Sequence, residues 1–313
     1  MQPNRTFLFA PGNHPRKVEK VFDAGADAVI LDLEDAVAIS EKAATRAVVV
    51  EALQRPRKCR GYVRVNALDT AFCFGDVEAV VARGVDGIIL PKVERAADLE
   101  KVDWLMTGLE EKAGLPAGGI DLIPILETGK GIANAREICS AGGRLKRVAF
   151  GAGDYTRDMN MEWTIDEAEI APAQAEVVLA SRINGLEPPL DTVYIHIKDD
   201  DGFTASARRA RQFGFQGKMC IHPVQVPLAN GVFTPTAEEA EFSRKVIAAF
   251  AEAEAAGSAS IQLDGYFIDY PIVEKARRVV APMTVKRGSF KRTFFAPGPL
   301  PTIKSSTKSS IAG

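Results

Sequence analysis

Two carboxylates follow apolar runs at positions where they could bind a metal together. Glu127 ends the run in "DLIPILETGKG" (121–131), and Asp154 ends "RVAFGAGD" (147–154), where glycines flank it. Mg²⁺ takes one or two carboxylates and completes its shell with water and substrate oxygens. The alternative is that each acid caps the helix that follows it, although Glu is a poor cap. The pair favours a magnesium site at Glu127 and Asp154.

Arg64 lies in the middle of an otherwise apolar run, "YVRVN". A guanidinium in such a run must be paired or face a polar centre. It could bind a substrate carboxylate or stabilise a developing oxyanion. Alternatively, it forms a buried ion pair with Asp32 or Glu34.

The segment "LDLEDAV" holds three acids, Asp32, Glu34 and Asp35. Strand alternation places Asp32 and Glu34 on one face and Asp35 near the strand exit. Because like charges repel, some of these acids must meet Arg64, Lys92 or the water shell of the metal. We expect Asp35 and Lys92, the latter from "GIILPKV", to contribute to substrate binding.

Positive charge gathers in "PGNHPRKVEK", which holds His14, Arg16, Lys17 and Lys20. Such a cluster suits phosphate groups, and Arg16 and Lys20 are candidate substrate-binding residues. For each lysine taken alone, a solvated helix face is the alternative. His222, at the end of the last expected strand, is a candidate orienting group.

Short apolar runs rich in Val, Ile and Leu alternate with amphipathic patterns along the chain. Strands buried on both faces, as in a parallel sheet, have this composition. Eight such strands favour a (β/α)₈ TIM barrel over an open doubly wound sheet, and a barrel gathers functional groups at the carboxyl ends of its strands. The expected strands span residues 6–12, 27–35, 61–66, 86–93, 121–127, 147–154, 192–198 and 217–222.

The helical patterns define three regions. We expect the barrel over residues 1–235, a C-terminal helical arm or lid over 236–285, and a poorly ordered tail over 286–313, which is rich in Ser, Thr and Lys. The expected helices span residues 15–24, 40–53, 72–82, 96–113, 131–140, 166–184, 205–213, 236–256 and 273–280.

Composition excludes several classes of protein. The 313 residues are 46% hydrophobic, and 39 Lys and Arg against 41 Asp and Glu argue against nucleic-acid binding. Four cysteines fit no zinc pattern and indicate free thiols in a reducing cytoplasm. We expect no signal peptide, and no apolar run approaches the roughly 20 residues that a membrane span needs.

An ordered series of motifs resembles the citrate lyase β-subunit-like family, within the HpcH/HpaI aldolase and malyl-CoA lyase superfamily. The similarity covers about residues 5–280. The motifs are "FLFAPGNHPRKVEK", "DAVILDLEDAV", "YVRVN", "GIILPKV", "PILETGKG", "FGAGDYT" and "GKMCIHPVQ".

The resemblance implies a Mg²⁺-dependent lyase that cleaves or forms a C–C bond in a 3-hydroxyacyl-CoA such as malyl-, citramalyl- or citryl-CoA. The products of cleavage would be a 2-oxo acid and acetyl-CoA. By motif position, Glu127 and Asp154 resemble the metal ligands, and Arg64 the residue that binds substrate and stabilises the enolate. It also implies a homotrimer or hexamer in which an arm aspartate, here Asp269 rather than Asp264, enters a neighbour's active site as a catalytic residue.

One departure keeps other functions open. The family's PGxRP motif reads "PGNHP" here, so His14 replaces an arginine on the CoA side and leaves Arg16 or Lys20 to compensate. The alternatives are a CoA-independent, pyruvate-type class II aldolase, an acyl-CoA thioesterase on the same scaffold, or a non-catalytic metabolite-binding protein. The general base is not identifiable from the residues.

Overall fold

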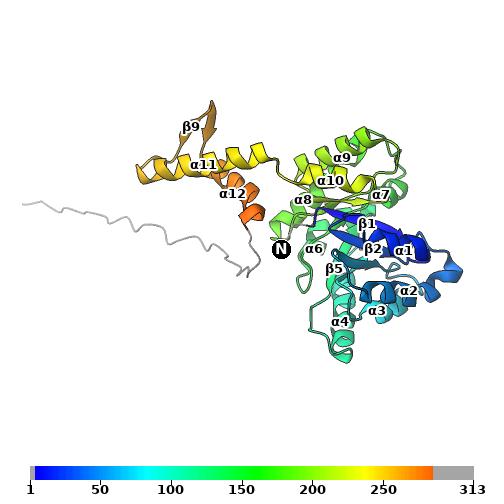
Figure 1. Ribbon diagram of the computed structural model, residues 1–313. Helices are drawn as coiled ribbons and strands as arrows, with labels where there is room; N and C mark the ends of the chain where they lie inside the picture. The colour runs from blue at the N-terminus through cyan, green and yellow to red at the C-terminus, as the bar shows by residue number, and fades with distance from the viewer. Residues whose placement is uncertain (1–3, 285–313) are drawn as a thin grey trace, which may run out of the picture.

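The computed structural model describes residues 4–284, and in it eight parallel strands close into a barrel in chain order (Figure 1). The (β/α)₈ prediction is confirmed, and the open sheet is excluded because β1 pairs with β8. The expected tail, 286–313, lies outside the described residues. The strands are β1 Thr6–Pro11, β2 Ala28–Asp32, β3 Arg60–Arg64, β4 Gly87–Leu90, β5 Asp121–Leu126, β6 Ala149–Phe150, β7 Leu190–Asp191 and β8 Gly217–Cys220.

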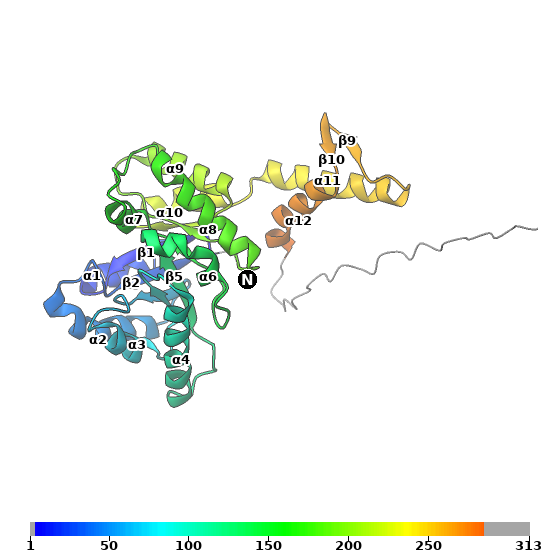
Figure 2. The same cartoon turned by 180° about the vertical axis from the view of Figure 1, so that it is seen from behind.

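Helices follow the strands and surround the barrel (Figures 1 and 2). The described part of the barrel contains α1 Pro15–Val21, α2 Lys42–Gln54, α3 Cys73–Val80, α4 Ala96–Lys112, α5 Gly129–Ala133, α6 Ala135–Cys139, α7 Ala152–Asp158, α8 Ala171–Ile183, α9 Asp200–Phe213 and α10 Gln225–Phe233.

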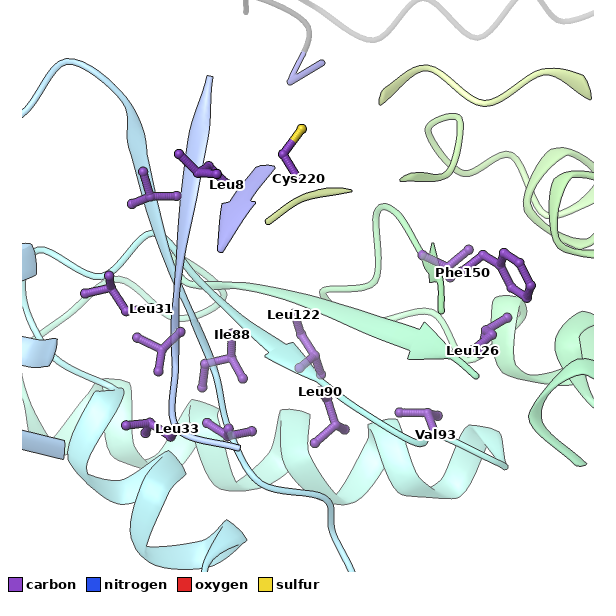
Figure 3. Packing of buried hydrophobic residues seen from close by; sticks show 14 of the residues in the cluster. Leu8, Leu31, Leu33, Ile88, Leu90, Val93, Leu122, Leu126, Phe150 and Cys220 are labelled. Atoms are coloured by element: carbon purple, nitrogen blue, oxygen red, sulfur yellow. The ribbon is translucent and has the colours of Figure 1, made fainter. Parts of the chain in front are cut away.

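Strand alternation divides the apolar side chains into two cores. One core fills the lumen, with Phe7, Ile30, Tyr62 and Ile123 among its buried members. The other lies between the strands and the helices, as the labelled side chains of Figure 3 show. Filling the lumen with side chains closes it to solvent, so chemistry is confined to its carboxyl end. The outer core includes Leu8, Leu31, Leu33, Ile88, Leu90, Val93, Leu122, Leu126, Phe150 and Cys220.

The seventh strand was predicted in the wrong place. We expected it at 192–198, but β7 is only Leu190–Asp191, and Ile195, His196 and Ile197 are exposed in the loop that follows. The β-branched residues have strand propensity, yet a strand also requires a partner. On this side the partner, β6, consists of two residues, so the ladder ends early.

Several expected helices differ in extent: the helix expected at 205–213 begins earlier, at Asp200, and α7 and α10 were not expected. The helix expected at 131–140 is broken at Asn134, which has non-helical backbone angles and separates α5 from α6. The helix expected at 166–184 begins at Ala171, after a short 3₁₀ turn (Ala168–Ile170). Pro172 in the first turn of α8 explains the later start, because proline is compatible with that turn and not with a helix interior.

A C-terminal arm projects from the barrel in both views of the fold (Figures 1 and 2). Its helix α11 (Ala237–Ala255) starts at a capping box formed by Thr236 and Glu239. A hairpin of β9 (Ile261–Leu263) and β10 (Tyr266–Ile268), which we did not expect, precedes α12 (Tyr270–Thr284). The arm buries a small core of its own: Val246, Phe250, Ile268, Val273 and Ala276.

The helices of residues 4–284 include none that is long and apolar enough to traverse a lipid bilayer.

Candidate active site

Arg64 is fixed at the top of the lumen by the register of β2 and β3. Asp32 and Arg64 are directly paired across these strands. Arg64 Nε and Nη2 each donate to Asp32 at 2.7 Å, and the guanidinium lies over the Phe9 ring, 5.0 Å from its centroid. Burial and Arg64 act in opposite directions on Asp32, and the pKa of Asp32 is lowered overall. A bidentate pair of this kind sets the orientation of the guanidinium.

The third guanidinium nitrogen of Arg64 points to the other two acids of the same segment. Nη1 lies 2.9 Å from Glu34 Oε2 and 3.3 Å from Asp35 Oδ2. The expected contact between Arg64 and this acidic segment is therefore confirmed. Asp35 is the most exposed of the three acids, so a substrate anion could replace it at Nη1 with the least rearrangement.

Lys92 connects the acidic segment with both predicted metal ligands. Its Nζ donates to Glu34 Oε1 at 2.5 Å and lies 3.4 Å from Asp154 Oδ2. Its backbone N–H donates to Glu127 Oε1 at 2.9 Å. Lys92 has a φ of +53°, which is uncommon for a residue with a side chain and is concentrated at functional sites. This conformation lets one residue present its amide to Glu127 and its ammonium to Glu34.

Glu127 is a buried carboxylate that follows β5 directly. It does not cap α5, because the Thr128 hydroxyl accepts from the Gly131 N–H instead. Burial raises the pKa of Glu127 to about 8, with nearby carboxylates adding to the effect and Arg64 and Lys92 opposing it. An anion this costly is stabilised when a cation binds beside it.

Gly151 makes room for Glu127. A β-carbon on Gly151 would lie 2.4 Å from Glu127 Oε2 and 2.8 Å from Glu127 Cβ. Any residue other than glycine would therefore displace the carboxylate. The sequence shows glycines in this loop, but only the structure shows that Gly151 faces Glu127, the predicted metal ligand on the neighbouring strand end.

Asp154 lies in the first turn of α7, where a negative charge is favourable, and its side chain caps no helix. Its Oδ1 pairs with Arg157 at 2.7 Å, and its Oδ2 faces Lys92. Neither predicted metal ligand therefore caps a helix with its side chain, contrary to the alternative interpretation. Within residues 4–284, no group of three or more His, Cys, Asp or Glu side chains is arranged to hold a metal, so the protein would supply two carboxylates.

This donor set fits Mg²⁺. Mg²⁺ prefers oxygen ligands, retains waters and is bound through one or two carboxylates together with substrate oxygens. Glu127 and Asp154 are the residues that would hold it. The ammonium group of Lys92, near Glu34 and Asp154, would balance carboxylate charge that the metal does not neutralise.

A cavity of about 360 Å³ opens beside the mouth of the barrel at β1 and β8. Its lining includes Arg16, Lys17 and Lys20 of α1 together with Phe9, Ile221 and His222. The predicted basic cluster is thus placed next to the strand ends that carry Arg64. Exposed His14, at the start of α1, does not line this cavity.

Asp269 is not brought to this site within one chain. It follows β10 in the arm, and α12 packs near the amino ends of β1 and β8, at the opposite end of the barrel. Glu34 is the residue whose role the sequence left open, although its spacing of two from Asp32 already placed both acids on one face. It pairs with Arg64 and Lys92 together.

The chain is similar to known proteins over most of its length. The family model "HpcH/HpaI aldolase/citrate lyase" matches residues 5–223, which is the barrel. Citrate lyase subunit beta of Leuconostoc mesenteroides subsp. cremoris is 38% identical over 278 residues, covering 88% of this chain and 92% of that protein. The chain belongs to the HpcH/HpaI aldolase/citrate lyase family. Like its relatives, it is a lyase.

Further members of the HpcH/HpaI family support the assignment. The L-malyl-CoA/beta-methylmalyl-CoA lyase of Cereibacter sphaeroides is 36% identical, covering 89% of this chain and 94% of that protein. The crystal structure of CitE from Mycobacterium tuberculosis in complex with magnesium, acetoacetate and coenzyme A superposes with a TM-score of 0.73 at 28% identity, covering 90% of this chain and 98% of that chain. The predicted family is confirmed.

Proposed function

We propose that the protein is a Mg²⁺-dependent carbon–carbon lyase acting on a 3-hydroxyacyl-CoA thioester. The observation that carries the proposal is the buried Glu127 carboxylate, held beside Asp154 and within the field of Arg64 at the top of the lumen. The CitE structure with magnesium and coenzyme A and the similarity to malyl-CoA lyase support both the metal and the thioester.

Glu127, Asp154 and Arg64 have different roles in the proposed cleavage of the C–C bond. Mg²⁺, when bound by Glu127 and Asp154, would supply Lewis-acid stabilisation of a substrate carboxylate and the oxygen that becomes the 2-oxo group. Arg64, oriented by Asp32, stabilises the negative charge that reaches the thioester oxygen. The 3-hydroxyl proton leaves, the C2–C3 bond breaks, and its electron pair forms the acetyl-CoA enolate, which is then protonated. The other product is a 2-oxo acid.

The basic cavity at the mouth suits the phosphate groups of the thioester. Arg16 and Lys20 supply charge there, and Phe9 and Ile221 supply apolar surface. This arrangement compensates for His14, which stands where the family commonly has arginine. Arg64 lies over Phe9 of this cavity and contacts Asp35, Lys92 also contacts Asp35, and the backbone N–H of Lys92 donates to Glu127. We therefore assign Asp35 and Lys92 to the acyl end of the substrate.

The arm supplies the remaining catalytic group from a neighbouring copy. Asp269 lies too far from the site of its own chain to take part in the reaction there. We therefore propose that the protein forms a homotrimer or hexamer in which Asp269 enters the barrel mouth of a neighbouring subunit and transfers a proton. Exposed aromatic side chains on the arm, at Tyr266, Phe267 and Tyr270, support a contact between copies. We retain 1–235 as the catalytic unit and 236–285 as the arm.

All four cysteines, each in the described residues, are free thiols. This supports a reducing compartment, and we propose the cytoplasm.

One assay tests the reaction and its competitors. Malyl-, citramalyl- and citryl-CoA are each incubated with the purified protein with and without Mg²⁺, and 2-oxo acid, acetyl-CoA and free CoA are quantified. Equal amounts of 2-oxo acid and acetyl-CoA support the proposal. Free CoA without 2-oxo acid would identify a thioesterase. Absence of CoA binding by calorimetry, together with cleavage of a free 2-oxo-4-hydroxy acid, would identify a CoA-independent aldolase.

Variants test the assignments. Glu127→Ala and Asp154→Ala should each abolish Mg²⁺-dependent turnover, whereas Glu111→Ala, at an exposed position of α4, should not change it. Full activity in either of the first two variants would refute the metal site. Asp269→Ala should also be inactive, and mixing it with Glu127→Ala after subunit exchange should restore part of the activity if the arm acts between copies.

A further inference from the structure

A second cavity lies at the end of the barrel opposite the catalytic carboxylates. It has a volume of about 570 Å³ and separates the amino ends of β1 and β8 from helix α12 of the arm. A cavity of this size accommodates a ligand of nucleotide dimensions. Its walls are Arg5, Val178, Arg182, Pro188, Arg211, Gly214, Phe215, Gln216, Phe233, Thr234, Pro235, Lys275, Arg278 and Val279.

The lining of this cavity is strongly basic. Five of its residues are Lys or Arg, and none is Asp or Glu. Three of the five have carboxylate partners behind the lining: Arg5 pairs with Asp27, Arg211 with Glu239, and Arg278 with Glu274 at 3.8 Å. Arg182 and Lys275 make no ion pair with any described residue, so the cavity carries a net positive charge.

Part of the basic charge has a structural explanation. Arg182 and Arg211 lie in the last turns of α8 and α9, where a cation balances the helix dipole. That explanation does not extend to Arg5, on the strand side, or to Lys275 and Arg278, on α12. Cations from the barrel and the arm face one space, where their mutual repulsion is relieved if an anion binds between them.

The floor of the cavity is apolar and preformed. Phe215 and Phe233 are buried side chains, and Val178 and Val279 complete this surface. Gly214 ends α9 in the left-handed conformation, with a φ of +110°, and a β-carbon there would lie 3.1 Å from Val178 Cγ1. Arg5 is held at the rim by Thr234, whose hydroxyl accepts from Arg5 Nη1 at 2.6 Å. The cavity therefore combines a cationic rim with an aromatic and aliphatic floor.

The chain's own C-terminal residues do not match this cavity. The 29 residues after Thr284 include no Asp or Glu and carry six basic residues, which a basic cavity repels. These residues are Lys286, Arg287, Lys291, Arg292, Lys304 and Lys308.

We propose that this cavity binds an organic phosphate with an apolar or aromatic body, of the nucleoside polyphosphate class. The phosphates would contact Arg182, Lys275 and Arg278, and the body would lie on the half-buried Val178, Pro235 and Val279, which cover buried Phe215 and Phe233. Because the rim belongs to both the barrel and α12, the bound ligand fixes the arm against the barrel. The site is separate from the proposed catalytic function and does not depend on it.

ATP binding to the full-length protein, measured by calorimetry in EDTA, tests the proposal. The measurement uses an Arg16→Glu/Lys20→Glu background, so that the basic cavity at the barrel mouth does not contribute. Adding Arg182→Glu and Lys275→Glu should weaken ATP binding by about tenfold or more, which corresponds to about 1.4 kcal/mol. Adding Lys112→Glu, at an exposed position of α4 away from the arm, should not change it.

Other measurements separate the parts of the proposal. Tripolyphosphate should bind more weakly than ATP, since it cannot use the apolar floor, and ATP should slow hydrogen exchange in α12. No ATP binding in the Arg16→Glu/Lys20→Glu background, or equal affinity with and without the Arg182 and Lys275 substitutions, would overturn the site. Tripolyphosphate affinity equal to that of ATP would overturn the assignment of an apolar body.

Discussion

The raised pKa of Glu127 predicts a stability effect that can be measured without any substrate. In metal-free protein the carboxylate has a folded-state pKa of about 8, against a reference value of 4.5. An acid with a raised pKa is protonated in the folded protein and ionised in the unfolded chain between these two values. Stability is therefore lost as the pH rises from 4.5 towards 8, and the loss is complete above 8.

The substitution Glu127→Gln removes this loss while keeping the shape of the protonated acid. At pH 6 the variant should already be more stable than wild type by about 2 kcal/mol, because wild-type Glu127 is neutral in the folded protein and ionised in the unfolded chain, about 1.5 pH units above the reference value. Between pH 6 and pH 9 the wild type passes through about two pH units below its folded pKa, at about 1.4 kcal/mol each. The advantage of the variant should thus grow by about 3 kcal/mol between pH 6 and pH 9, or about 6 °C in Tm, and reach about 5 kcal/mol at pH 9.

The measurement is thermal or denaturant unfolding at pH 6 and pH 9 in EDTA, with Glu111→Gln on the exposed face of α4 as the matched control. The control should follow wild type at both pH values. Addition of Mg²⁺ at pH 9 should stabilise wild type and leave Glu127→Gln unchanged, since only the wild type supplies the Glu127 carboxylate beside Asp154. If Glu127→Gln and wild type show parallel pH dependence, Glu127 is ionised in the folded protein at pH 6 and the reasoning is wrong.

Three further predictions concern other parts of the structure. Gly151→Ala should force Glu127 aside by about 1 Å, which lowers kcat/KM roughly 100-fold while calorimetry shows weaker Mn²⁺ binding. Arg64→Lys should lower kcat with little change in Tm, because it removes the bidentate contact with Asp32 and keeps the charge; equal kcat in steady-state assays would contradict an enolate role. Lys218→Met should destabilise the protein by about 3–5 kcal/mol in urea unfolding, because the charge of fully buried Asp191 loses its cation and keeps the Gln174 amide as a donor. Adding Asp191→Leu should recover much of the loss.

Much of the active site was predictable because its residues follow a local rule. In a parallel barrel all carboxyl strand ends meet at one face, so Glu127, Asp154, Arg64 and Lys92 could be placed together once their strands were identified. The ion pairs of Arg64 also followed from alternation, which put Asp32 and Glu34 on one face of the strand expected at 27–35. The roles assigned to these residues in catalysis stay predictions until they are tested.

The amino-acid sequence by itself determined the barrel, the family and the polar residues at the mouth, because periodicity and ordered motifs are properties of the chain. Only the tertiary structure decided features that depend on distances between remote segments. These include the short β7, which ends where its partner β6 ends, and the contact that requires glycine at position 151 beside Glu127. They also include the position of the arm, which takes Asp269 away from its own site and closes a basic cavity at the other end of the barrel.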